Sequence, residues 1–206
     1  MCSRTERLVA HLLIASLITA LVNTAWASPP TALDLEARTH LLAAARASIA
    51  RFVGGPPIIE ADDLRLHRFR AGVFVTLELD GCVRGCRGTL SPITPSLIDE
   101  VRRNAVAAAT NDRRFPRLRA ADLARARISI TVVTDLAPAG PIIDDLAFDE
   151  GLVVRCGDKV GVVLPYEGRD PRTRLDWGYR KAGVTARDAC DIFRMRAIRF
   201  AEEVSR

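Results

Sequence analysis

Residues 69–89 read FRAGVFVTLELDGCVRGCRGT, and this stretch contains the clearest structural signal in the chain. Apolar residues recur at every second position from Phe69 to Leu79, while Arg70, Thr76 and Glu78 lie on the opposite side. This alternation predicts a strand with one buried face. The Asp80-Gly81 pair that follows is a two-residue turn typical of β-hairpins. We therefore predict a second strand, antiparallel to the first, over residues 82–89.

The segments on both sides of this hairpin show a mixture of helical and strand patterns. Helical spacing predicts helices over 34–53, opened by Thr31, over 94–110, capped by Thr94, and over 172–182, with a short helix capped by Thr185. Strands are expected over 128–134, 152–156, 160–164 and 193–200, and a loop over 136–146. Without a regular strand-helix-strand repeat, the predicted class is α+β, with a mainly antiparallel sheet flanked by helices.

The composition excludes several protein classes but indicates no reaction. The chain has 206 residues, of which 49% are hydrophobic and 27% charged, so it is neither collagen-like nor wholly disordered. Its net charge of +5 is small, and the basic residues form no stripe with interleaved aromatic residues. Nucleic-acid binding is therefore disfavoured. The phosphate-binding, zinc-protease and serine-hydrolase motifs are absent from the sequence.

The first 27 residues have the layout of a secretory signal peptide. Arg4 and Arg7 precede a charge-free apolar run over 12–22, and Ala25-Trp26-Ala27 follows as a small-x-small cleavage site. The run is shorter than the ~20 residues that cross a bilayer. We predict a leader over 1–27, a single domain over 28–206, and an exported, periplasmic or secreted protein with no stable membrane span. The alternative is an uncleaved anchor.

Export makes disulfide bonds possible, although four cysteines are too few to replace the hydrophobic core as the source of stability. Four remain after the leader, namely Cys82, Cys86, Cys156 and Cys190, and they allow three complete disulfide pairings among which the sequence does not choose. In a strand, the Cα atoms of Cys82 and Cys86 lie ~13 Å apart, whereas a disulfide requires less than ~7 Å. We therefore expect no bond between these two. A zinc site on the four thiols is disfavoured, because structural zinc requires tightly paired ligands.

Three glycines interrupt the second strand of the hairpin around Cys86, namely Gly81, Gly85 and Gly88. Glycines inside a strand mark a bulge or a close approach by a ligand or another backbone. Arg84 and Arg87 flank Cys86 and are expected to favour its thiolate and lower its pKa. The alternative is that Cys86 is a small core residue in a tightly packed sheet.

A catalytic thiol would also need a base. His40 and His67 are the histidines outside the leader, and a surface position is the simpler account of each. Asp112 is the candidate carboxylate base, with a helix-end cap or a salt bridge to Arg113 or Arg114 as its alternative. Trp177 and Tyr179, on the helix over 172–182, could line a pocket, although packing on the sheet is the simpler account of their positions.

Several ordered blocks resemble the AMMECR family, whose bacterial and archaeal members are called AmmeMemoRadiSam system protein A. The resemblance extends over about 33–202 and rests on RGCRGTL at 84–90, NA at 104–105, DRRFP at 112–116, ISI at 128–130, GL at 151–152, GVVLP at 161–165 and RKAG at 180–183. It implies a compact α+β domain with a smaller lobe and a cleft near the Arg-Gly-Cys block. Memo-like and radical-SAM proteins are implied as partners by association. The resemblance implies no defined reaction and no cofactor.

Two functions from different classes follow. The first is an exported enzyme or redox protein that uses Cys86 as a thiol, with Asp112 in support. The second is a binding module that docks a small anionic ligand or a protein partner without turnover. In both, the expected ligand-binding residues belong to the glycine-rich block: Arg84, Gly85, Arg87, Gly88 and Thr89. No metal site is expected.

Cleavage of the leader after Ala27 predicts a mature protein that begins at Ser28. The charge-free run is too short to span a membrane and is followed by a peptidase site. N-terminal sequencing or intact-mass analysis of the exported protein measures this directly. Recovery of a chain that still begins at Met1, in a membrane fraction, would contradict the prediction.

Overall fold

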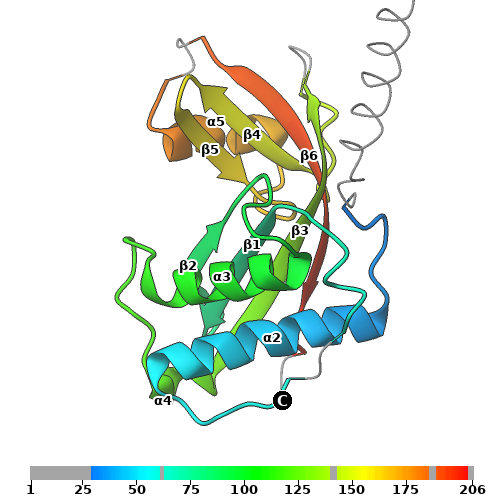
Figure 1. Ribbon diagram of the computed structural model, residues 1–206. Coiled ribbons are helices and arrows are strands. Elements are labelled where there is room, and N and C mark those ends of the chain that lie inside the picture. The colour runs from blue at the N-terminus through cyan, green and yellow to red at the C-terminus, as the bar shows by residue number, and fades with distance from the viewer. Residues whose placement is uncertain (1–28, 61–62, 140–142, 186–188, 204–206) are drawn as a thin grey trace, which may run out of the picture.

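The computed structural model describes residues 29–60, 63–139, 143–185 and 189–203. One six-stranded sheet, in the order β2-β1-β3-β6-β4-β5, runs through them, and each neighbouring pair of strands is antiparallel (Figure 1). The predicted α+β class with an antiparallel sheet is confirmed. The elements in chain order are α2 (Leu35–Val53), β1 (Val73–Leu79), β2 (Cys82–Gly88), α3 (Leu97–Thr110), α4 (Ala120–Leu123), β3 (Ala126–Pro138), β4 (Gly151–Cys156), β5 (Lys159–Val163), α5 (Pro171–Ala182) and β6 (Asp191–Ala201).

The predicted hairpin is present as β1 and β2. Asp80 and Gly81 both have positive φ, 52° and 78°, as the tight hairpin turn requires. The register shifts between Leu77 and Glu78, so that Arg84 of β2 is an extra residue without a direct partner on β1. Beyond this bulge Cys86 pairs with Thr76. The strand between Cys82 and Cys86 is therefore continuous, and both cysteines are free.

The main core lies on one face of β1 and β3. Val73, Val75 and Leu77 of β1 are fully buried there, in the same cluster as side chains of α2 and α3. The second face of β1 is also buried, since Phe74 is only 8% exposed and Thr76 only 7%. The expectation of one buried face was therefore wrong. The sheet curls, and Phe74 packs in a second cluster with residues of the C-terminal half such as Leu164 and Met195.

α2 and α5 begin and end within one residue of the predicted segments, whereas α3 begins at Leu97 instead of residue 94, and α4 was not predicted. Two caps also differ. Asp34, rather than Thr31, caps α2 by accepting a hydrogen bond from the Ala37 amide, at 2.8 Å. Ser96, rather than Thr94, caps α3. Thr94 has another role, because its hydroxyl and its amide both donate to the buried carboxylate of Glu100. Within the described residues, no helix is long and apolar enough to cross a membrane.

The strand predicted over 128–134 is longer than its β-branched run. β3 continues to Pro138 because Leu136, Ala137 and Pro138 pair with the first half of β6. The expectation of a loop from residue 136 was therefore wrong at its start, where cross-strand pairing outweighs the turn-forming composition. The short helix expected at Thr185 falls on residues 186–188, which lie outside the described residues.

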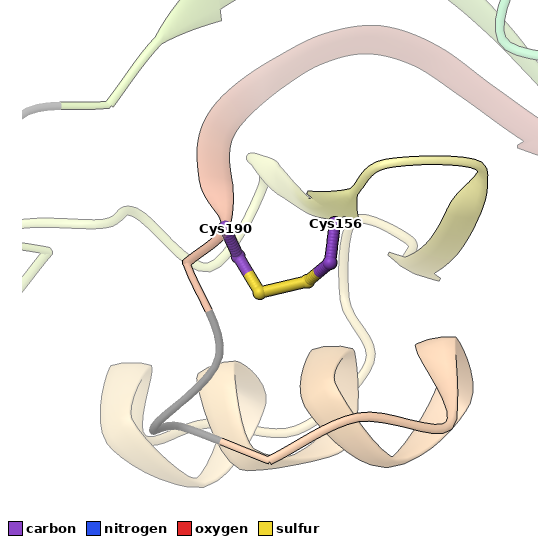
Figure 2. The surroundings of a disulfide bond; sticks show 2 residues. All are labelled: Cys156 and Cys190. Atoms are coloured by element: carbon purple, nitrogen blue, oxygen red, sulfur yellow. A yellow bond between two sulfur atoms is a disulfide. The ribbon is translucent and has the colours of Figure 1, made fainter.

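A smaller lobe consists of β4, β5, α5 and the neighbouring part of β6. The helix α5 packs closely on β5, because Gly161 lies against the Gly178 carbonyl, leaving no room for a side chain. A disulfide joins Cys156, at the end of β4, to Cys190, just before β6 (Figure 2). Each of the three complete pairings that the sequence allows would form two disulfides. The structure has one disulfide and two free thiols, so it differs from all three. The loop that it closes contains all of β5 and α5.

The close approach of α3 leaves no room for a side chain at Gly85 of β2, because a Cβ added there would lie 2.1 Å from the Ala108 carbonyl oxygen. We predict that Gly85→Ala lowers the free energy of unfolding by about 2 kcal/mol or more, through overpacking between strand and helix. Chemical denaturation measures the change. Gly55→Ala is the control, since its nearest new contact is an ordinary 3.4 Å. Equal stability of the two variants would contradict the close approach.

Candidate functional site

The two edge strands of the curled sheet, β2 and β5, border one cleft of about 640 Å³. This volume lies within the range usual for small-molecule sites. One wall comes from β1, β2 and the loop after α3, and the other from β5, the loop after it and α5. The apolar lining includes Phe74, Phe115, Val160, Val162, Leu164 and Trp177. The ionisable lining consists of Cys86, Arg87, Arg114, Glu167 and Lys181.

Cys86 lies half-buried in the wall of this cleft and packs against the cluster around Phe74. Burial raises the pKa of its thiol, and the hydroxyl of Thr76, which donates to Sγ at 3.2 Å, offsets part of that rise. Glu167 also raises this pKa, while Arg114 and Lys181 lower it. The pKa was expected to be lowered by Arg84 and Arg87. The pKa of Cys86 is instead raised, because loss of hydration outweighs the nearby cations.

Asp112 and Arg114 bond the backbone of Cys86 on the outer edge of β2. The Cys86 amide donates to Asp112 Oδ2 at 2.8 Å, and the Arg114 guanidinium donates to both oxygens of Asp112, with its Nη2 also 3.4 Å from the Cys86 carbonyl oxygen. Burial acts to raise the pKa of Asp112, but the Arg114 and Cys86 donors outweigh it and hold the value at about 2. Asp112 is therefore an ionised structural partner of Cys86 in this arrangement, which includes the salt bridge to Arg114 considered as its alternative role.

The glycine-rich block divides between the cleft and the core. Arg87 and Gly88 line the cleft together with Cys86. Arg84 donates to the carbonyls of Pro116 and Arg117, and Gly85 faces α3. The hydroxyl of Thr89 donates to Glu100 at 2.6 Å. The structure therefore brings Cys86, Asp112, Arg87 and Gly88 together, and it places Arg84, Gly85 and Thr89 in contacts outside the cleft.

The far wall contributes an ion pair that sequence reasoning did not include in the site. Lys181 of α5 donates to Glu167 at 2.6 Å and to the Val162 carbonyl of β5 at 2.9 Å. Glu167 also accepts from the Leu164 amide. Glu167 and Lys181 come just after GVVLP and within RKAG, two of the blocks that carried the family resemblance. Their place in those blocks was the available signal, but no spacing rule connects them to Cys86.

Neither candidate histidine belongs to this cleft. The ring of His40 lies 3.4 Å from Asp63, and His67 is exposed in the loop before β1. Two of the four thiols considered for zinc are joined in the disulfide between Cys156 and Cys190. Across the described ranges, no group of three or more His, Cys, Asp or Glu side chains is placed to hold a metal ion.

Comparison with known proteins gives consistent matches over most of the chain. The family model described as AMMECR1 matches residues 42–205. A protein of Thermotoga maritima is 36% identical over 162 residues, covering 74% of this chain and 91% of the relative. A protein of Methanothermobacter thermautotrophicus is 34% identical over 155 residues, covering 70% and 75%. Among solved structures, the uncharacterized protein PH0010 from Pyrococcus horikoshii aligns with a TM-score of 0.68 at 25% identity, covering 79% of this chain and 90% of that one.

The raised pKa of Cys86 predicts slow alkylation at neutral pH, since the thiolate is the reactive form. Mapping iodoacetamide adducts across pH should give an apparent pKa for Cys86 above the ordinary value of ~8.5. Thr76→Val removes the hydroxyl that donates to Sγ and should raise that pKa further. Thr110→Val is the matched control, because the Thr110 hydroxyl bonds the Val106 carbonyl within α3. An apparent pKa below 8 in the unmodified protein would contradict the role given to burial.

Proposed function

The chain belongs to the AMMECR1 family, and from the geometry of its cleft we propose that this protein binds a small organic anion between β2 and α5. One observation carries the proposal. Three cationic side chains from separate elements, Arg87 of β2, Arg114 of the loop after α3 and Lys181 of α5, line one cleft that also has an apolar lining. A site of this composition can bind an anionic group and the apolar body attached to it.

The three cations keep donors for a ligand. Arg87 is exposed, and within the described residues its side chain has no hydrogen-bond partner. Arg114 uses its Nε and Nη2 on Asp112 and Cys86, and its Nη1 has no hydrogen-bond partner among the described parts of the chain. Lys181 uses two of its three N–H groups, on Glu167 and Val162. An anion in the cleft would therefore gain donors without first breaking the two ion pairs.

The edges of the two strands favour a small molecule over a peptide. An extended peptide that joins a sheet needs free backbone groups on an edge strand. Here the outward amide and carbonyl of Cys86 already contact Asp112 and Arg114, and the Val162 carbonyl accepts from Lys181. Side chains thus occupy the backbone positions that a peptide strand would use, which is a common protection of sheet edges.

A second candidate is a thiol-dependent reaction at Cys86, in which the sulfur attacks an electrophile bound in the same cleft. The hydroxyl of Thr76 favours this function, because it donates directly to Sγ and so stabilises a thiolate. Arg114 and Lys181 act in the same direction. In this reaction Asp112 would position Cys86 by accepting a hydrogen bond from the backbone amide of Cys86. Binding remains the first proposal, because burial favours the neutral thiol.

We also propose that the protein acts outside the cytoplasm. The predicted leader over 1–27 supports this location, and so does the disulfide between Cys156 and Cys190, because such bonds persist mainly in oxidising compartments. A Memo-like protein or a radical-SAM protein remains a partner proposed through family association. The physical requirement for such a partner is access to the open side of the cleft.

Substitution of Arg87 tests the binding proposal with little risk to the fold, because this side chain is exposed and makes no hydrogen bond to the residues that the structure describes. We predict that Arg87→Gln weakens binding of a responsive anion about three- to tenfold, by loss of one charge-assisted contact. Calorimetry with aliphatic and aromatic carboxylates and phosphate monoesters, at low ionic strength, measures the affinity. Arg103→Gln, an exposed arginine of α3 outside the cleft, is the matched control.

Two results would overturn this proposal. One is that no anion in the panel binds the unmodified protein at millimolar concentration. The other is that Arg103→Gln weakens binding as much as Arg87→Gln, which would show a general effect of net charge rather than a contact in the cleft.

A further inference from the structure

Aromatic rings from three separate elements border the cleft: Phe74 of β1, Phe115 of the loop after α3 and Trp177 of α5. We infer that the ligand is an aryl monocarboxylate, and this inference rests on the anion-binding function proposed above. The flat ring of the ligand packs on Trp177, and its carboxylate contacts the arginines of the opposite wall. The inference has three supports: the fixed position of Trp177, the charge of the lining, and the arginine held over Phe115.

Trp177 is held in place before any ligand arrives. Its six-membered ring lies against Gly168, where an added Cβ would be 3.0 Å from Cζ3 and 3.3 Å from Cη2. Gly168 has a φ of +69°, which favours glycine at this position. The Trp177 side chain also packs against the core of the smaller lobe. A ring fixed in this way offers a flat surface at little entropic cost.

The indole of Trp177 lies where an aromatic ligand could use it. Trp177 is half-buried and borders both the main cleft and an adjoining hollow shared with Arg180 and Lys181. Within the described part of the chain, its N–H has no hydrogen-bond partner. A flat ligand can therefore contact the ring without displacing an existing bond.

The charges of the cleft favour one negative charge on the ligand. The lining has three cations, Arg87, Arg114 and Lys181, and one carboxylate, Glu167, which pairs with Lys181. A second carboxylate, Asp112, pairs with Arg114. The two carboxylates each pair with one cation, which leaves the charge of Arg87 uncompensated. A monocarboxylate would balance this charge, whereas a dianion would add repulsion with Glu167.

The opposite wall suits both parts of such a ligand. The guanidinium carbon of Arg114 lies 5.3 Å from the centre of the Phe115 ring, in a cation–π arrangement. Asp112 orients the same guanidinium through two of its nitrogens. The Nη1 group of Arg114 therefore lies on a fixed guanidinium and can donate a charge-assisted hydrogen bond to one oxygen of a ligand carboxylate.

The test uses the full chain with Trp26→Phe, so that Trp177 is the only tryptophan. Benzoate and cyclohexanecarboxylate form a matched pair, with one carboxylate and one six-membered ring each but with only one ring aromatic. Calorimetry should give benzoate an affinity roughly three- to tenfold higher than cyclohexanecarboxylate, as expected for ring-on-ring contact. Benzoate should also change the fluorescence of Trp177. In Trp177→Leu, which keeps an apolar side chain, the ratio of benzoate affinity to cyclohexanecarboxylate affinity should fall to about one, because both acids lose apolar contact but only benzoate loses ring-on-ring contact.

The possible failures are distinguishable. Equal affinity for the two acids would overturn the aryl inference and leave the anion site intact. A preference for benzoate that survives Trp177→Leu would overturn the contact with Trp177. Tighter binding of phenyl phosphate than of benzoate would overturn the assignment of a monoanion. If neither acid binds, and no other anion of the panel does, the anion site itself is wrong.

Discussion

The pairing of β3 with β6 is the constraint on which the rest of the structure depends. These two strands are the longest of the sheet, and they carry both halves of the protein: β1 and β2 attach along β3, while β4 and β5 attach along β6. A register shift between Val133 and Asp135 interrupts the pairing at the junction of the halves. Bulges of this kind bend strands. The bend allows the sheet to curl (Figure 1). Because the sheet curls, residues of both edge strands, β2 and β5, line the same cleft.

The same side chains therefore bond the edges of the sheet and line the cleft or support its lining. An open sheet leaves unpaired backbone groups on its outer strands. Here side chains bond three of these groups: Asp112 and Arg114 bond the amide and carbonyl of Cys86, and Lys181 bonds the carbonyl of Val162. The ionic groups that protect the edges are also the groups that charge the cleft. The disulfide between Cys156 and Cys190 closes the loop that contains every cleft residue of the far wall, from Val160 to Lys181. Local stability and the polarity of the site thus come from the same residues.

The sequence predicted most elements because their signals are local. Alternation identified β1, and Asp80-Gly81 identified the hairpin. Errors came from contacts distant in sequence, such as burial of the second face of β1 by the smaller lobe. The site was predicted only in part, because some of its residues are also distant in sequence. Cys86, Arg87 and Gly88 belong to one motif, whereas Glu167, Lys181 and Trp177 join them only through the curl of the sheet, and no local pattern reports that curl.

The two functions considered for the cleft make opposite demands on its charges. A thiolate at Cys86 needs Arg114 and Lys181 to offset the cost of burial, and these two cations do not offset it fully, since the pKa of Cys86 is raised. An anion bound to the same cations would neutralise them and exclude water, and both effects would raise that pKa further. A bound anion therefore keeps Cys86 as a thiol, which can donate a hydrogen bond but is a poor nucleophile. Thiolate chemistry in this cleft is favoured only with a substrate that leaves Arg114 and Lys181 unpaired by further negative charge.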